Sequence, residues 1–272
     1  MSNYYIPSNE QGVSESIGFM LIFTIVIAGI ALVTLYGYPL LLQQQLGAEE
    51  KIMEKNMIVL QNDMKSLAYK TVPFKETSLK IGGGSLTVYN SSYISSSSNI
   101  TIRHPSGGTT YVDAFSPGEL RFESVRSQTD ISLQNGAVMM RPRIQSGSTM
   151  LAEPRWFYDV NPITGERTMV INLINITSDS VMAKEGIGTV RMKLGETSYN
   201  YTQGLGATTL NLVYTPGPGQ DYSVAWDNYF TKTLNMGPPI ISGPTRTYTL
   251  PIDTTRSGTL VIKKFEVEVQ AI

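Results

Sequence analysis

The chain has 272 residues, a formal net charge of −1 at pH 7 and no cysteine, and only 16% of its residues are charged. The near-neutral charge gives no reason to expect nucleic-acid binding, which requires a concentrated basic surface. The lack of cysteine excludes disulfides and thiolate metal sites, and the length allows one or two domains.

The N-terminal stretch contains no lysine or arginine before the first apolar run. A secretory signal peptide has a basic start, an apolar run of roughly 7–15 residues and a small-residue cleavage site. Here the apolar run extends from Ile17 to Leu42, and no A-x-A site follows it. The sequence therefore predicts a permanent anchor rather than an ordinary cleaved signal.

A long helix is predicted from Ile17 to about Tyr69. Residues Ile17–Leu42 carry no charge, and roughly 20 apolar residues suffice to cross a bilayer. An apolar stripe at alternating four- and three-residue spacing follows, formed by Met53, Met57, Leu60, Met64 and Leu67. At ~1.5 Å per residue, the ~53 helical residues span about 80 Å. The stripe predicts packing on the protein's own β-sheet, and the alternative is packing on copies of the same helix.

Gly37 and Pro39 interrupt the apolar part of this helix. Proline has no backbone N–H, and its ring crowds the carbonyl of Leu35, while glycine adds flexibility at the same point. We therefore expect a helix break near residues 37–39, either a kink or a locally melted turn. Membrane helices tolerate such breaks where neighbours satisfy the backbone.

The residues in front of the helix, Gln11-Gly12-Val13-Ser14-Glu15-Ser16-Ile17-Gly18, resemble the leader junction of archaeal type IV pilins and archaellins. In that superfamily a prepilin-type peptidase cuts after a glycine just before the helix, and the mature helices pack into a filament core. The resemblance covers the junction and the long helix. It implies a leader at residues 1–12 and a cut between Gly12 and Val13.

The resemblance also implies that the helix of residues 13–70 leaves the membrane and assembles with identical helices. The residues implied in this assembly are Glu15, Ile17, Gly18, Phe19, Ile22, Phe23, Val26, Gly29, Ile30 and Val33. Glu15 would pair with the free amine of a neighbouring subunit, although it would be the third mature residue, whereas bacterial pilins carry a glutamate at the fifth. Gln11 stands where such leaders usually have a basic residue. The alternative is a plain membrane anchor preceded by solvated carboxylates.

Two signals for topology conflict. Lys51, Lys55 and Lys65 follow the apolar run and no basic residue precedes it, so the positive-inside rule would place the large domain in the cytoplasm. Long domains translocate largely regardless of charge, however, and the low charge and many serines and threonines suit an outer surface. We expect the large domain at the cell surface, on a filament or on a membrane anchor.

From about Thr77 onward the sequence predicts short strands. The strand-like runs are Leu86–Tyr89, Ile100–Arg103, Thr110–Val112, Glu119–Phe122, Ile131–Leu133, Ala137–Met140, Arg155–Val160, Met169–Ile174, Thr189–Leu194, Leu210–Tyr214, Ser223–Trp226, Thr245–Leu250 and Leu260–Val269. Asn135-Gly136 predicts a type I′ hairpin, and Asn161–Gly165 a longer hairpin loop. We therefore expect an α+β fold, in which the helix joins one all-β sandwich or barrel-like head domain at residues 71–272.

N-glycosylation sequons occur at Asn90, Asn99, Asn175 and Asn200. A chain this rich in serine and threonine contains nearly as many by chance, so the sequons are compatible with an outside location without establishing it.

Signals for catalysis are weak. The single histidine, His104, lies beside Pro105 in a predicted turn, and Gly82–Gly84 lack the G-K-[ST] ending of a phosphate loop and read as a turn between strands. No G-x-S-x-G elbow is present. The carboxylates of Glu119, Glu123, Asp130, Glu153 and Asp159 are scattered. The sequence predicts no enzyme, no cofactor and no metal.

The leading hypothesis is therefore a structural subunit of an archaeal type IV pilus-like filament, inserted in the membrane before assembly and polymerised through its N-terminal helix. The alternative is a monomeric, membrane-anchored extracellular β-domain that binds a sugar or a surface protein. The aromatic run Trp156-Phe157-Tyr158 fits either a sugar platform or the core of a strand.

Overall fold

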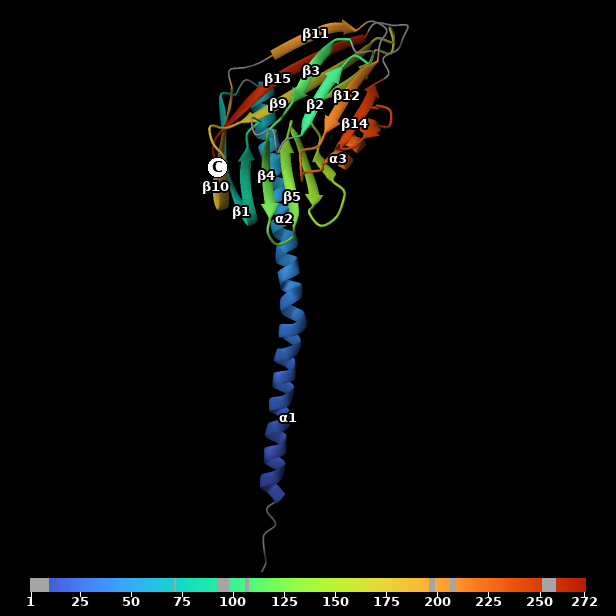
Figure 1. Ribbon diagram of the computed structural model, residues 1–272. Helices are drawn as coiled ribbons and strands as arrows, with labels where there is room; N and C mark the ends of the chain where they lie inside the picture. The colour runs from blue at the N-terminus through green and yellow to red at the C-terminus, as the bar shows by residue number, and fades with distance from the viewer. Residues whose placement is uncertain are drawn as a thin grey trace, which may run out of the picture. The chain divides into compact units, whose positions relative to one another are not determined.

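The computed structural model describes residues 10–70, 72–91, 98–105, 108–195, 199–205, 209–250 and 258–272. A long N-terminal helix is followed by a mostly β domain with two sheets, so the protein has the α+β fold that the sequence predicts (Figure 1). The chain divides into two units, Met1–Ala48 and Glu49–Ile272. The boundary therefore falls inside the predicted helix rather than at its end.

The first unit is helical in its described part. Helix α1 (Glu10–Leu32) leads into a π-helical turn, η1 (Val33–Gly37), and then into α2 (Tyr38–Lys70). At this turn the N–H of Tyr38 donates to the carbonyl oxygen of Val33, five residues back, as in a π-helix. The helix is thus widened just before Pro39 instead of melted. A π-turn relieves the crowding caused by a proline without ending the helix.

The second half of α2 packs on the larger sheet. The stripe residues Met53, Met57, Leu60, Met64 and Leu67 are fully buried. They share one hydrophobic cluster with strand residues that include Leu79, Phe122 and Val190. The packing on the protein's own sheet that the spacing predicts is therefore confirmed.

Within the described residues, the strands form a ten-stranded and a five-stranded sheet. Their bounds are β1 (Phe74–Tyr89), β2 (Asn99–Arg103), β3 (Thr110–Phe115), β4 (Glu119–Ser124), β5 (Thr129–Gln134), β6 (Ala137–Pro142), β7 (Thr149–Ala152), β8 (Phe157–Val160), β9 (Arg167–Thr177), β10 (Met182–Leu194), β11 (Tyr199–Leu205), β12 (Leu210–Thr215), β13 (Ile240–Ser242), β14 (Thr245–Leu250) and β15 (Gly258–Ala271). The larger sheet has the order β7-β6-β5-β4-β1-β10-β15-β9-β8, with β11 also paired to β15, and the smaller has the order β13-β14-β12-β2-β3. Strands β9 and β15 are parallel.

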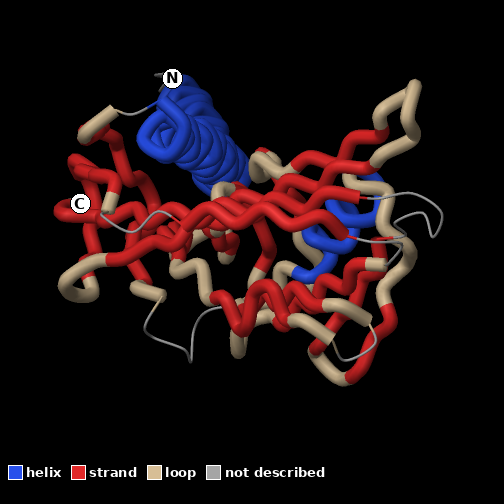
Figure 2. Tube along the Cα trace, turned by 90° about the horizontal axis from the view of Figure 1, so that it is seen from above, coloured by secondary structure: helices blue, strands red, loops and turns tan. Residues whose placement is uncertain are grey.

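The larger sheet is covered on both faces (Figure 2). On β9, Met169, Ile171 and Leu173 belong to the cluster shared with the smaller sheet. Ile174 and Ile176 belong to the cluster shared with α2. Successive side chains of a strand point to opposite faces, so a strand buried on both faces reads as a nearly continuous apolar run. The two clusters are the core of the head domain.

Two hairpins predicted from turn residues are confirmed. Asn135 and Gly136 both have positive φ, 48° and 72°, as a type I′ turn requires, and they join the antiparallel strands β5 and β6. The segment Asn161–Gly165 joins the antiparallel pair β8 and β9. In both cases the turn residues alone were sufficient to predict the hairpin.

The strand predicted at Ser223–Trp226 is wrong. These residues form helix α3 (Ser223–Asn228), which continues into a π-helical turn, η2 (Tyr229–Thr233). Buried residues recur there at helical spacing, namely Tyr222, Ala225, Trp226, Tyr229 and Phe230. This period extends beyond the run that read as a strand, and burial of its aromatic face stabilises the helix.

The turn predicted at Gly82–Gly84 is also wrong, because these residues lie inside β1. The pairing of β1 with β10 shifts register between Ile81 and Leu86, and Gly83 has a φ of 72°. A Cβ on Gly84 would lie 2.2 Å from the carbonyl oxygen of Glu123. The glycines therefore form a bulge that lets β1 approach β4 closely.

Several strand segments were not predicted from the sequence. They are the first half of β1, the first half of β10, and the strands β7, β11 and β13. The described side chains of β13 and most of those in the first half of β10 are exposed. Strands without a buried face lack the alternation of apolar and polar residues from which strands are predicted.

Gln61 is a polar residue on the buried face of α2, and it is only 1% exposed. Its Nε2 donates to the carbonyl oxygens of Gly136, at 2.6 Å, and of Glu153, at 3.0 Å. We expect Gln61→Met to lower the free energy of unfolding by about 1–3 kcal/mol, because the volume is kept while both donations are lost. Denaturant unfolding of the full chain measures this. Asn62→Met, at the exposed neighbouring position, should change the free energy of unfolding by less than about 0.5 kcal/mol. If both variants lost the same stability, the hydrogen bonds of Gln61 would not be the cause.

Candidate functional site

The apolar helix surface, defined as the side chains of Ile17–Leu42, is exposed on every side of the helix. Every large hydrophobic side chain in this range is exposed, from 38% at Leu42 to 73% at Tyr36. The segment Glu15–Lys70 is long and apolar enough to cross a membrane. A helix that is hydrophobic all round is stable only when its surface is covered, by lipid or by other apolar elements.

The sequence-predicted assembly residues lie on this surface, with Glu15 exposed just ahead of it. The exposed apolar members are Ile17, Phe19, Ile22, Phe23, Val26, Ile30 and Val33. A Cβ placed on Gly18 or Gly29 would meet nothing within 4 Å, so both glycines leave open indentations. The hydroxyl of Thr24 donates to the carbonyl oxygen of Met20 at 2.8 Å, so its polar group is satisfied within the helix.

The predicted processing site lies at the start of the described chain. Gly12 and Val13 lie within α1, and the structure describes only their backbone. Leader residues 1–9 also lie outside it. Gly37 is the last residue of the π-turn, and Pro39 follows two residues later.

The sequons differ in their surroundings. The side-chain amide of Asn90 donates to the carbonyl oxygen of Ser178 at 2.6 Å. Asn175 lies within β9, and its Oδ1 is buried. Asn99 is half-buried at the start of β2, and Asn200 lies on β11 with its side chain outside the described part. A glycan on Asn90 or Asn175 would have to displace these packed arrangements.

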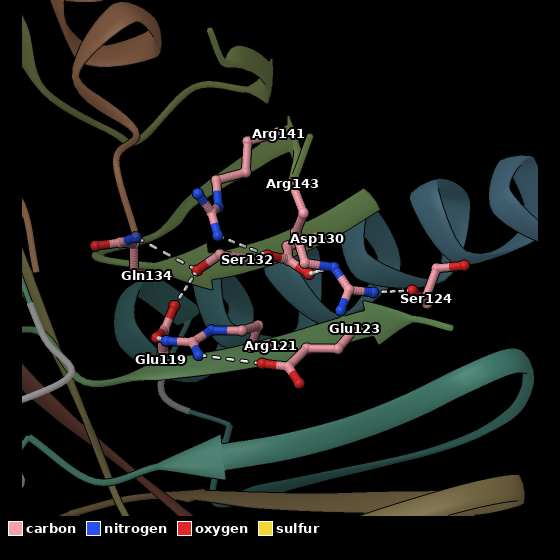
Figure 3. A network of polar contacts seen from close by, with 9 residues as sticks. All are labelled: Glu119, Arg121, Glu123, Ser124, Asp130, Ser132, Gln134, Arg141 and Arg143. Carbon is pink, nitrogen blue, oxygen red and sulfur yellow. Dashed lines mark hydrogen bonds and ion pairs between the residues drawn. The ribbon is translucent and has the colours of Figure 1, made fainter. Parts of the chain in front are cut away.

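A polar network joins strands β4, β5 and β6 on the face that points away from α2 (Figure 3). Asp130 accepts from Arg141 at 2.9 Å and pairs with Arg143 at 3.1 Å. Arg121 donates to Glu119 and, at 3.2 Å, to Glu123.

Neutral side chains extend this network. Ser132 donates to Glu119 at 2.6 Å, and Gln134 donates to Ser132 at 3.3 Å. Ser98, which precedes β2 of the smaller sheet, donates to Gln134 at 2.6 Å. The network therefore extends to the start of a strand in the opposite sheet.

The charges of the network balance one another in a buried setting. The side chain of Asp130 is 1% exposed and that of Arg141 is 15% exposed. Burial raises the pKa of the Asp130 carboxyl, while the guanidinium groups of Arg141 and Arg143 oppose that rise. Both Glu119 and Asp130 already contact arginines, so the arrangement is suited to holding strand register rather than to moving protons.

The sequence pointed to Glu119, Glu123 and Asp130 only as scattered carboxylates, and the arginine partners were missed. A signal was present, because Glu119 and Arg121 alternate in the predicted strand Glu119–Phe122. Glu123 follows at the same spacing, so the three side chains share a face of β4. The cross-strand pairing that brings Asp130 and Arg141 together requires the sheet register.

The remaining candidates for chemistry lie apart. Trp156 is buried and contacts Trp226 and Phe230, with ring centroids 6.0 and 5.7 Å away, so it is a core residue rather than a sugar platform. The backbone N–H of His104 donates to the carbonyl oxygen of Thr109. Within the described ranges, no three His, Asp or Glu side chains come together as metal ligands would.

Comparison with models of protein families gave a match over residues 11–269 to DUF7289, a family of unknown function. Comparisons with curated proteins and with solved structures gave no match. The matched range contains the apolar helix surface and both sheets, apart from the last two residues of β15. The family model therefore covers the helix and the head domain together.

Proposed function

Since this chain belongs to the DUF7289 family, we propose from its structure that it is a structural subunit of an archaeal type IV pilus-like surface filament, assembled through its N-terminal helix. The observation that carries the proposal is the apolar helix surface, which is exposed on every side. The β-rich head domain is then displayed at the cell surface.

The length of the apolar surface supports assembly in addition to anchoring. At ~1.5 Å per residue, Ile17–Leu42 spans about 39 Å, more than the ~30 Å of a bilayer core. In the membrane, lipid covers this surface. After extraction, identical helices cover it, and burial of apolar area drives the association. Head-to-tail contacts that do not close on themselves produce helical filaments.

The junction Gln11–Gly18 supports a processing step before assembly, by a prepilin-type peptidase. A cut between Gly12 and Val13 would leave a free amine two residues ahead of Glu15. In a close-packed bundle, this amine and the exposed Glu15 carboxylate of a neighbouring copy can pair, so that neither charge is buried alone.

N-terminal sequencing of the chain from sheared cell-surface filaments tests the proposal. We expect the mature protein to begin at Val13, because the peptidase cuts after Gly12. Gly12→Ala should leave the full-length chain in the membrane and remove it from filaments. The matched control is Gly18→Ala, whose added methyl meets open space and should leave cleavage unchanged. An intact Met1 in every fraction, with no filaments by electron microscopy, would defeat the proposal.

A further inference from the structure

A cavity of about 520 Å³ lies between β3 of the smaller sheet and the strands β9 and β15 of the larger sheet. Its apolar lining comes from Leu173, Ile262 and Phe115, all of them buried core residues. Ligand sites in proteins are mostly apolar cavities of roughly 300–1,000 Å³ with a few convergent polar groups. The volume and the lining of this cavity match that description.

Two buried polar atoms in the lining have no hydrogen-bond partner among the described residues. They are the Oδ1 of Asn175 and the Oγ of Ser116, each exposed by less than 1 Å². Buried polar atoms are nearly always paired, because they give up hydrogen bonds to water. A ligand toward which these two side chains turn could donate to Asn175 and exchange a hydrogen bond with Ser116, and so satisfy both.

A β-bulge shapes the rim of the cavity. Ile100 pairs with Phe115 and Ile102 with Val112, so two residues of β3 lie opposite one residue of β2. Ala114 in this bulge has a φ of 42°, and its N–H donates to the hydroxyl of Thr101 at 3.1 Å. A non-glycine residue at positive φ is strained, and such strain and such bulges are frequent at binding sites.

The charges in the lining favour a ligand without net charge. Asp113 and Lys264 both line the cavity, and neither forms an ion pair within the described part of the chain. The ammonium of Lys264 lies 5.5 Å from the centre of the Phe115 ring. An anion would meet the Asp113 carboxylate, and a cation would meet the Lys264 ammonium. A ligand with many hydroxyl groups can donate to the first and accept from the second.

We propose that this cavity binds a neutral saccharide of one or two hexose units. Its hydroxyl groups bond to Asp113 and Lys264, and also to Asn175 and Ser116 once these two side chains turn toward the ligand. The C–H face of the saccharide packs on the half-buried ring of Tyr111. The binding goes beyond filament assembly and does not depend on it, because every residue of the lining belongs to the head domain.

Saturation-transfer NMR with the full chain in a detergent that carries no sugar tests the proposal. The probes are glucose, galactose, mannose, N-acetylglucosamine, maltose and cellobiose, with leucine as a zwitterionic probe. We expect transfer to at least one saccharide. Asn175→Ala should weaken that binding by about tenfold or more, since one buried hydrogen bond is lost. Its thermal midpoint should be unchanged or higher, because Asn175 Oδ1 bonds to no described group.

The neighbouring lysines of β15 provide a matched control. Lys264→Met should weaken binding, whereas Lys263→Met, on the opposite face of the same strand, should leave it unchanged. Transfer to leucine alone, transfer to no saccharide, or equal effects of the two lysine variants would overturn the proposal. So would an Asn175→Ala variant that loses thermal stability while it keeps full binding.

Discussion

Replacing Val26 with aspartate should abolish recovery of the chain in surface filaments. Val26 lies near the middle of the apolar helix surface, and its side chain is 52% exposed. A carboxylate at the centre of a membrane helix costs about 2.5–3.5 kcal/mol on insertion. In a filament each subunit would bury one such carboxylate in the apolar helix bundle. The free-energy cost of burying the charge therefore applies to every subunit that is added.

Electron microscopy and sedimentation of surface preparations measure this effect. The matched control is Ile163→Asp, which adds the same charge at a residue 91% exposed in the loop between β8 and β9. We expect the control to assemble as the wild type does. Filaments of Val26→Asp at wild-type abundance would show that this helix does not form the filament core.

The processing variant separates anchoring from assembly. Gly12→Ala leaves the apolar helix surface intact and should remain in the membrane fraction, whereas Val26→Asp should be depleted from both membranes and filaments. If both variants were fully retained in membranes, the apolar surface would not be the element that inserts.

Replacing Asp130 with alanine should lower the free energy of unfolding by about 3–5 kcal/mol. The change removes the carboxylate that pairs with Arg141 and Arg143. The side chain of Arg141 is only 15% exposed, so water cannot replace the lost partner fully. The side chain of Arg143 is 38% exposed and is more easily hydrated. An unpaired buried charge is therefore the main cause of the loss.

Denaturant unfolding of the full chain measures this loss. The control Asp159→Ala, which removes an exposed carboxylate on β8, should change the free energy of unfolding by less than about 0.5 kcal/mol. Adding Arg141→Met to Asp130→Ala should recover part of the stability, because the second change removes the stranded guanidinium. Strictly additive losses would show that the two side chains are not energetically coupled.

The sequence was sufficient where the decisive physics is local. Residues Ile17–Leu42 contain no charge, and a long uncharged apolar run has few stable states other than a covered helix. The stripe from Met53 to Leu67 lies on one face because the helical period places it there. Asn135-Gly136 specified its hairpin, since both residues adopt positive φ readily.

The sequence was misleading where the outcome depends on distant contacts. Ser223–Trp226 read as a strand, but the aromatic face that continues to Phe230 is buried in the core and stabilises a helix. The glycines at 82–84 read as a turn, although the close approach of β1 to β4 keeps them inside a strand. Local propensity is a weak guide when burial against other elements contributes more free energy.

The polar network around Asp130 and the polar lining of the cavity both depend on contacts between strands that are far apart in the sequence. Asp130 meets Arg141 only because β5 and β6 pair in one register, and Asn175 reaches the cavity only because β3 lies across β9 and β15. Composition and periodicity specify that a helix and a β-domain form, since each rests on neighbours within a few residues. They do not specify which side chains converge, because convergence arises from strand register and sheet packing between residues far apart in the chain.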